Sequence, residues 1–183
     1  MHSIIHRRFL SHLLFFALAA VPSLSCAQSI QPVKAKALDE SEVVLPVPNG
    51  RQLLLLVIGF SHKSGEACSA WGKRLAPSYT SDPHTTYYQL AELQSAPAFV
   101  RGMIIHGMRK DVPPAQQAHF VPLFDHEAEW KALVQFSAPD DPYVVLAAPD
   151  GRVLWQTHGA VSDSVFAALQ STVAKFAGAS AQP

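Results

Sequence analysis

The sequence is poor in cysteine and in charge, and it lacks a long apolar run. Only two of its 183 residues are cysteines, which excludes a disulfide-rich scaffold. Charged residues make up 15%, with 14 basic and 14 acidic side chains, so the chain has no excess of positive charge with which to bind nucleic acid. A hydrophobic fraction of 49% at zero net charge argues against disorder. The length predicts one domain with a buried core.

Residues 1–27 have the pattern of a secretory signal. A basic start is followed by an apolar stretch over 13–21 and by small residues that end at Ala27. The apolar stretch is shorter than the ~20 residues that a membrane helix requires. We therefore expect export to the periplasm with cleavage after Ala27. An uncleaved N-terminal anchor and a lipoprotein formed through Cys26 are the alternatives.

Cleavage would leave Cys68 as the single cysteine of the mature chain. An exported protein with one thiol cannot form an internal disulfide, so the thiol is buried, reactive or paired with another molecule. We expect no metal and no cofactor, because the histidines beyond the signal show no metal-ligand spacing. These histidines are His62, His84, His106, His119, His126 and His158.

The mature chain alternates strand and helix patterns, which predicts an α/β layer sandwich. We expect a mobile arm over 28–42, one domain over 43–178 and a disordered tail over 179–183. Pro77 should stop the first helix. The expected strands cover 43–47, 52–60, 85–93, 119–124, 143–148 and 152–157. The expected helices cover 65–76, 97–110 with one apolar face, 125–134 with Asp125 as its cap, and 162–176 closed by Gly178.

This order of elements resembles the thioredoxin fold. A buried strand ends in Gly59-Phe60, Cys68 follows at the start of a helix, and Pro142 precedes a hairpin as the cis-proline does in thioredoxin-like proteins. The resemblance covers about 43–176. It implies a three-layer sandwich with a central mixed sheet, a helix inserted between the second strand and the cis-Pro hairpin, and a Cys68 that faces Pro142.

The chain departs from the catalytic patterns of that superfamily. Thioredoxins need a second thiol to resolve a mixed disulfide, and Gly65 stands where the first cysteine of the pair is expected. Peroxiredoxins carry a Pro-x-x-x-Thr-x-x-Cys motif, in which Ser61 and Gly65 replace the proline and the threonine. Sco-type copper chaperones resemble the run at 59–62, but Lys63 replaces their first cysteine, so a two-thiolate copper site is missing.

The segment also resembles the thioredoxin-like assembly factors of the mitochondrial F-type ATP synthase and their bacterial relatives. The resembling features are the Gly-Phe-Ser run at 59–61, Trp71 in the next helix, and Arg101, Arg109 and Lys110 in the inserted helix. The resemblance implies assembly of a membrane complex rather than turnover of a small substrate. It also implies that these four side chains contact a protein client, although a core position for Trp71 and a solvated basic face are the plainer interpretations.

Two functions therefore stay open. The first, which we favour, is a binding or assembly module for a membrane or envelope protein complex. The second is a one-cysteine thiol peroxidase or oxidoreductase with an external thiol reductant, in which Cys68 is the nucleophile, His62 a base and Pro142 a shaping residue. A helix N-terminus would favour the Cys68 thiolate, whereas burial in the core would make the thiol inert. A copper site made by Cys68 and His62 is a smaller third hypothesis.

Overall fold

The computed structural model describes residues 28–47 and 51–180 in two sheets and five helices. A two-stranded antiparallel sheet contains β1 (Val33–Lys36) and β2 (Glu42–Leu45). A five-stranded mixed sheet has the order β5-β4-β3-β6-β7. Its strands are β3 (Leu53–Gly59), β4 (Thr85–Glu92), β5 (Phe120–Leu123), β6 (Tyr143–Ala147) and β7 (Val153–His158). The helices are α1 (Ser64–Tyr79), α2 (Ala98–Asp111), the 3-10 helix η1 (Pro114–His119), α3 (Glu127–Leu133) and α4 (Asp163–Ser180).

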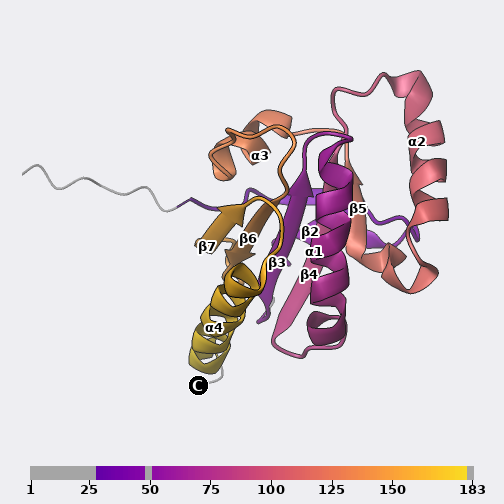
Figure 1. The fold of residues 1–183 in the computed structure, drawn as a ribbon. Helices are drawn as coiled ribbons and strands as arrows, with labels where there is room; N and C mark the ends of the chain where they lie inside the picture. The colour runs from indigo at the N-terminus through magenta and orange to yellow at the C-terminus, as the bar shows by residue number, and fades with distance from the viewer. Residues whose placement is uncertain (1–27, 48–50, 181–183) are drawn as a thin grey trace, which may run out of the picture.

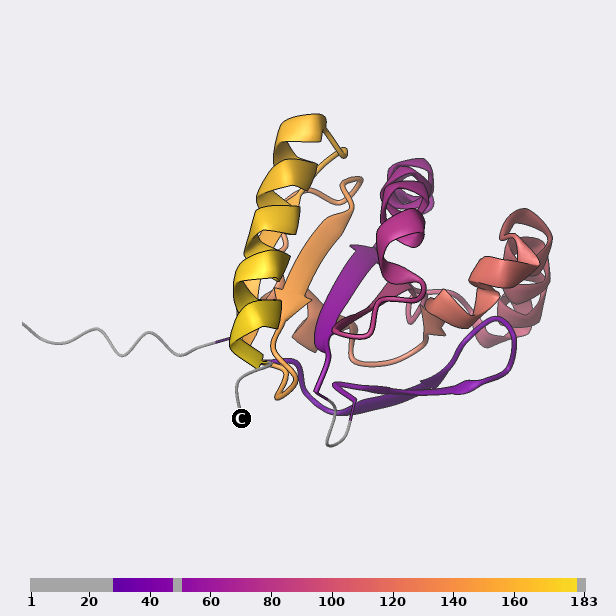
Figure 2. The same ribbon diagram turned by 90° about the horizontal axis from the view of Figure 1, so that it is seen from below.

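The centre of the large sheet is β3, which is apolar on both faces and buried along its whole length. It pairs in parallel with β4 and antiparallel with β6. Such a strand suits a sheet that is covered on both sides. The helices α1 and α4 cover one face, and α3 with the β1–β2 hairpin covers the other (Figure 1 and Figure 2). The predicted three-layer α/β sandwich is confirmed.

Most predicted elements are present, with shifted ends. The helix α1 continues past Pro77 to Tyr79, because a proline in the last turn removes only one helical hydrogen bond. The helix α4 continues past Gly178, and α3 begins after His126 without a cap from Asp125. No helix of the described residues is long and apolar enough to cross a membrane.

The segment 28–42 differs from the expected mobile arm. It contains β1, and the side chains of Val33 and Leu38 are buried in the core. The alternation of apolar and polar residues over 33–36 is the signal for this strand, although four residues make a weak one. The signal segment 1–27 and residues 181–183 of the expected tail lie outside the described residues.

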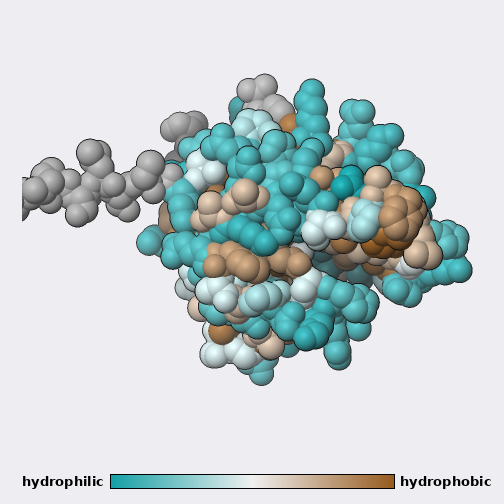
Figure 3. Space-filling view, turned by 90° about the horizontal axis from the view of Figure 1, so that it is seen from above, coloured by the Kyte–Doolittle hydropathy of each residue, from teal (hydrophilic) through white to brown (hydrophobic). Residues whose placement is uncertain are grey.

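The inserted helix α2 is present, but its apolar residues do not enter the core. None of its residues is buried, and Phe99 and Met103 are 87% and 70% exposed. Figure 1 shows α2 at the edge of the molecule, beside β5. From above, the hydrophobic cluster on the right of the surface in Figure 3 lies over this helix. The spacing of apolar residues predicts that a helix has one apolar face. It does not show whether another element packs on that face, and in α2 none covers Phe99 or Met103.

Candidate functional site

Cys68 lies on the inner face of α1, directly against the end of β3. A Cβ atom built on Gly59 would come within 2.9 Å of the Cys68 Sγ and 2.8 Å of the Ser64 Oγ. Only glycine therefore leaves room for the first turns of α1 to approach the strand this closely. The glycine that ends the apolar run is what brings the thiol onto the sheet.

The Cys68 thiol is buried, with 8% of the residue exposed. Burial raises the pKa of Cys68 from 9.0 to about 11, and hydrogen bonding from Ser64 opposes the shift without cancelling it. The thiol is therefore protonated at neutral pH. The helix N-terminus is expected to lower the pKa of Cys68. Desolvation raises it by more, so the pKa is higher than that of an ordinary cysteine.

The loop between β3 and α1 is tied to the loop before β6. Ser61 and Ser64 bond reciprocally, since the Ser61 Oγ accepts from the Ser64 N–H at 3.1 Å and the Ser64 Oγ donates to the Ser61 carbonyl at 2.8 Å. The Ser61 Oγ donates to the Asp140 Oδ1 at 3.0 Å, and the Lys63 Nζ lies 3.5 Å from the Asp140 Oδ2. Lys63, which stands where Sco-type chaperones have their first cysteine, thus forms an ion pair with Asp140.

Pro142 lies at the same end of the sheet as Gly59, because the next residue, Tyr143, pairs with Ile58. The Asp141–Pro142 bond is not cis, contrary to the prediction: among the described residues the only cis peptide bond joins Leu45 to Pro46. Trans is the lower-energy isomer of an X-Pro bond, and the resemblance alone favoured cis.

Trp71 is fully buried, so it does not face a partner. Its indole N–H donates to the Gly159 carbonyl at 3.0 Å, and the Gly159 N–H donates to the Pro142 carbonyl at 2.9 Å. Trp71 lies three residues after Cys68 and therefore on the same inner face of α1. The plainer interpretation as a core residue is the correct one, and the tryptophan links α1 to both loops at this end of the sheet.

Two connected hollows open beside Cys68. A cavity of about 310 Å³ is bounded by the ends of β3 and β4, the start of α1 and the inner face of α2, and Cys68 itself is part of its lining. A groove of about 950 Å³ continues between α1 and α2, and we call it the α1–α2 groove. His62 is exposed and lines both, and its ring has no hydrogen-bond partner among the described residues. Shared lining residues are His62, Gly65, Gln89, Ile104, Met108 and Phe120.

Arg101 and Arg109 hold the two ends of α2. The Arg101 guanidinium donates to the Ala96 and Gln94 carbonyls at 2.9 and 3.1 Å and stacks 4.8 Å from the centre of the Phe124 ring. The Arg109 Nε donates to the Leu38 carbonyl at 2.7 Å. Arg109 also pairs with Glu40 of the hairpin, whereas Lys110 is exposed without an ion pair among the described residues. The contact of these residues with a client stays a prediction.

We expect Arg109→Ala to loosen α2 without unfolding the sheet. The variant loses a charge-assisted hydrogen bond to a main-chain carbonyl, which contributes roughly 1.5–3 kcal/mol. Because α2 buries no residue, hydrogen exchange of its amides should accelerate by at least about ten-fold while that of β3 stays unchanged. Lys110→Ala is the matched control, since it removes a neighbouring charge that has no such bond. Equal exchange in the two variants would contradict the role of Arg109 as an anchor.

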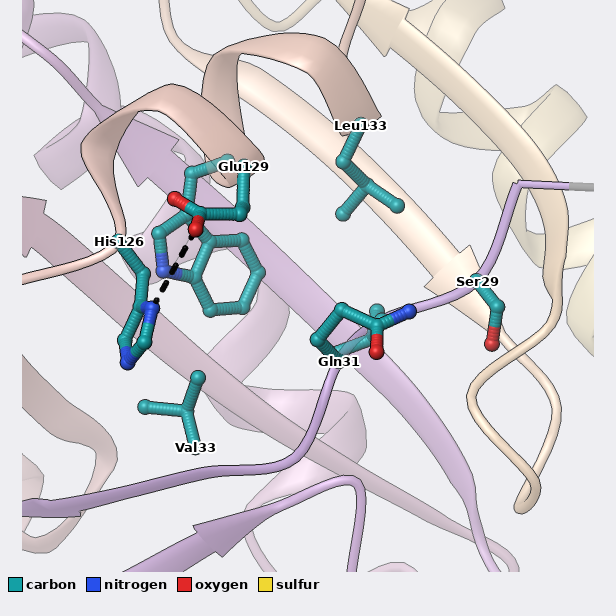
Figure 4. A pocket seen from close by; sticks show the side chains of 8 residues that line it. Ser29, Gln31, Val33, His126, Glu129 and Leu133 are labelled. Carbon is teal, nitrogen blue, oxygen red and sulfur yellow. Dashed lines mark ion pairs between the residues drawn. The ribbon is translucent and has the colours of Figure 1, made fainter.

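A separate small cavity of about 30 Å³ lies on the other face of the sheet, between residues 29–33 and α3. Figure 4 shows its labelled lining, where the His126 Nδ1 lies 3.6 Å from the Glu129 Oε1. The indole nitrogen of Trp130, which also lines it, is buried without a hydrogen-bond partner. This volume suits an ordered water rather than a substrate. Over 28–47 and 51–180, no three His, Cys, Asp or Glu side chains are grouped to hold a metal ion.

Comparison with known proteins supports the fold. No family model and no curated protein matches the sequence. Among solved structures, the exposed lipoprotein thioredoxin of Streptococcus pneumoniae matches with a TM-score of 0.54 and 9% identity, over 77% of this chain and 99% of that one. A Sco-family cytochrome c oxidase assembly protein, BsSco, matches with a TM-score of 0.52 and 12% identity, over 81% and 95%. A putative thiol:disulfide interchange protein DsbE from Chlorobium tepidum matches with a TM-score of 0.53 and 14% identity, over 82% of this chain and 96% of that one.

The protein has a thioredoxin-like fold. At 9–14% identity these neighbours show the fold alone, and the predicted thioredoxin-like fold is confirmed at that level. The finer resemblance to ATP synthase assembly factors is not shown by these comparisons.

Proposed function

We propose that this chain is an exported thioredoxin-fold protein that binds a protein client of a membrane or envelope complex and does not act through thiol chemistry. The observation that carries the proposal is the state of Cys68, whose thiol is buried and whose pKa is raised to about 11. A peroxidase or oxidoreductase needs a thiolate within reach of its substrate. The hydrogen bond of Ser61 and the ion pair of Lys63 with Asp140 also support the proposal, because they hold the loop before α1 against the loop before β6.

The surface around the buried thiol supports a binding role. The α1–α2 groove is large enough for a peptide segment, and the exposed Phe99 and Met103 lie on the helix that forms one wall. Exposed apolar residues that gather in one place are typical of interaction surfaces. Export to the periplasm, with cleavage after Ala27, belongs to the same proposal.

Thiol reactivity tests this proposal directly. At pH 7 a thiol with a pKa of about 11 carries roughly one hundredth of the thiolate of an ordinary cysteine. We expect maleimide to label Cys68 about 100-fold more slowly in the folded protein than in urea, with no change after exposure to peroxide. Ser69→Cys in a Cys68→Ala background is the matched control, because Ser69 is the exposed neighbour and should label rapidly.

Rapid native labelling that peroxide abolishes would overturn the proposal and favour the one-cysteine peroxidase. A second measurement tests by photocrosslinking whether binding of the client depends on Cys68. A photocrosslinker at Met103 should trap the same membrane or envelope protein with native Cys68 and with Cys68→Ala. Loss of that crosslink in a folded Cys68→Ala protein would show that the thiol is needed.

A further inference from the structure

The floor of the α1–α2 groove holds a polar group without a partner. Gln89 on β4 is only 4% exposed, and its amide forms no hydrogen bond among the described residues. A Cβ atom built on Gly72 would come within 2.4 to 2.5 Å of all three amide heavy atoms, so the amide lies flat against α1. It also lines both the groove and the cavity beside Cys68. The Gln89 amide is not among the fully buried atoms without a partner, so it reaches the solvent of the groove and is available to hydrogen-bond a ligand there.

The two walls of the groove differ in chemistry. The α2 wall presents the apolar side chains of Met103, Ile104 and Met108, with the carboxylate of Asp111 at its C-terminal end. The α1 wall presents small and polar residues, among them Gly65 and Ser69. An occupant that fits both walls carries apolar side chains on one side and polar ones on the other.

The α1 wall also carries two opposite charges that no ion pair satisfies. Glu66 and Lys73 both line the groove and are exposed, and neither forms an ion pair within the described part of the chain. They lie seven residues apart on one face of α1, which corresponds to about 10 Å along the helix axis. The complementary occupant therefore carries a basic and an acidic group at about this separation.

An extended segment meets these conditions better than a helix. A polyproline-II segment forms no internal hydrogen bonds, so its main-chain groups are free to pair with the Gln89 amide. Its residues three apart lie on the same side at a separation of about 9 Å, close to that of Glu66 and Lys73. A helix, by contrast, satisfies its own main-chain groups along its length.

We propose that the α1–α2 groove binds an extended, polyproline-II-like peptide segment of a protein client, with a basic and an acidic residue three positions apart. The basic side chain pairs with Glu66 and the acidic one with Lys73. The intervening apolar residues pack on α2, and the peptide main chain bonds the Gln89 amide. This inference rests on the proposed binding function and names the chemistry of its client.

The test uses the purified protein and a fluorescein-labelled peptide of sequence SPKVLEPS, with anisotropy as the readout. We expect saturable binding with a Kd below about 1 mM. Glu66→Lys and Lys73→Glu should each weaken binding about five-fold or more, and Gln89→Leu about three-fold or more. Glu42→Lys and Lys34→Glu make the same charge changes on the exposed β1–β2 hairpin and should leave the Kd unchanged.

Peptides with one sign of charge, SPKVLKPS and SPEVLEPS, should bind at least about five-fold more weakly than the mixed peptide. No saturable binding, or equal losses in the groove and hairpin variants, would overturn the inference. So would tighter binding of a helical peptide with its charges seven residues apart. None of these outcomes depends on the thiol, so failure of the groove is distinct from failure of the proposed function, which the Cys68 labelling decides.

Discussion

Replacing Trp71 with alanine should lower the free energy of unfolding by about 3–5 kcal/mol. The side chain projects from α1 and is fully buried, with its ring centroid 6.5 Å from that of Phe166 on α4. The substitution opens a large cavity and also leaves the Gly159 carbonyl without its indole donor. For a domain of this size, the melting temperature should fall by roughly 6–20 °C.

Urea unfolding followed by circular dichroism measures this loss. Trp71→Phe is the matched control, because phenylalanine keeps most of the volume and removes the hydrogen bond. Its expected cost is about 1–2 kcal/mol. A loss below 1 kcal/mol for Trp71→Ala would contradict a core position and revive the interpretation that Trp71 meets a partner.

Alkaline pH should destabilise the protein through Cys68. The pKa of the thiol is raised to about 11 by burial in the folded state, against an ordinary value of 9.0. Between these values the unfolded chain gives up its proton first, so the folded state binds more protons and the free energy of unfolding falls as pH rises. The contribution is fully present below about pH 9 and amounts to about 2 kcal/mol lost by pH 11.

The comparison that isolates this effect is with Cys68→Ala. Burial also raises the pKa values of Tyr79 and Tyr87, and these tyrosines titrate in both proteins. The stability difference between the native chain and Cys68→Ala should therefore be constant below about pH 9 and shrink by about 2 kcal/mol towards pH 11. A difference that does not change with pH would show that the folded thiol titrates normally.

The sequence predicts the sheet well because its strands carry their own signals. The apolar run over 53–58 identifies β3, and the Pro-Asp-Gly turn at 149–151 identifies the hairpin of β6 and β7. The sequence also predicts β2, as the strand over 43–47, but β1 is missed because its four residues give a weak local signal. Pairing with β2 and burial of residues such as Val33 stabilise β1, and a local window of sequence shows neither.

The site is less predictable because its properties arise between distant segments. The position of Cys68 in the sequence suggests a reactive thiol, and its burial depends on contact with the end of β3. Asp140 lies 79 residues after Ser61, so no spacing rule predicts their hydrogen bond. The free amide of Gln89 is missed for the same reason, since a glutamine within a strand gives no sign of its partners.

Because of the way α2 is attached, stability of the fold and recognition of a partner depend on different residues. Residues that stabilise a fold are constrained by packing, and residues that recognise a partner must change when the partner changes. Because α2 is held by its arginines and contributes no buried side chain, its apolar wall can be substituted without opening a cavity in the sheet. If the groove binds a client as proposed, related chains can diverge at Met103, Ile104 and Met108 to suit different clients while the rest of the molecule stays equally stable.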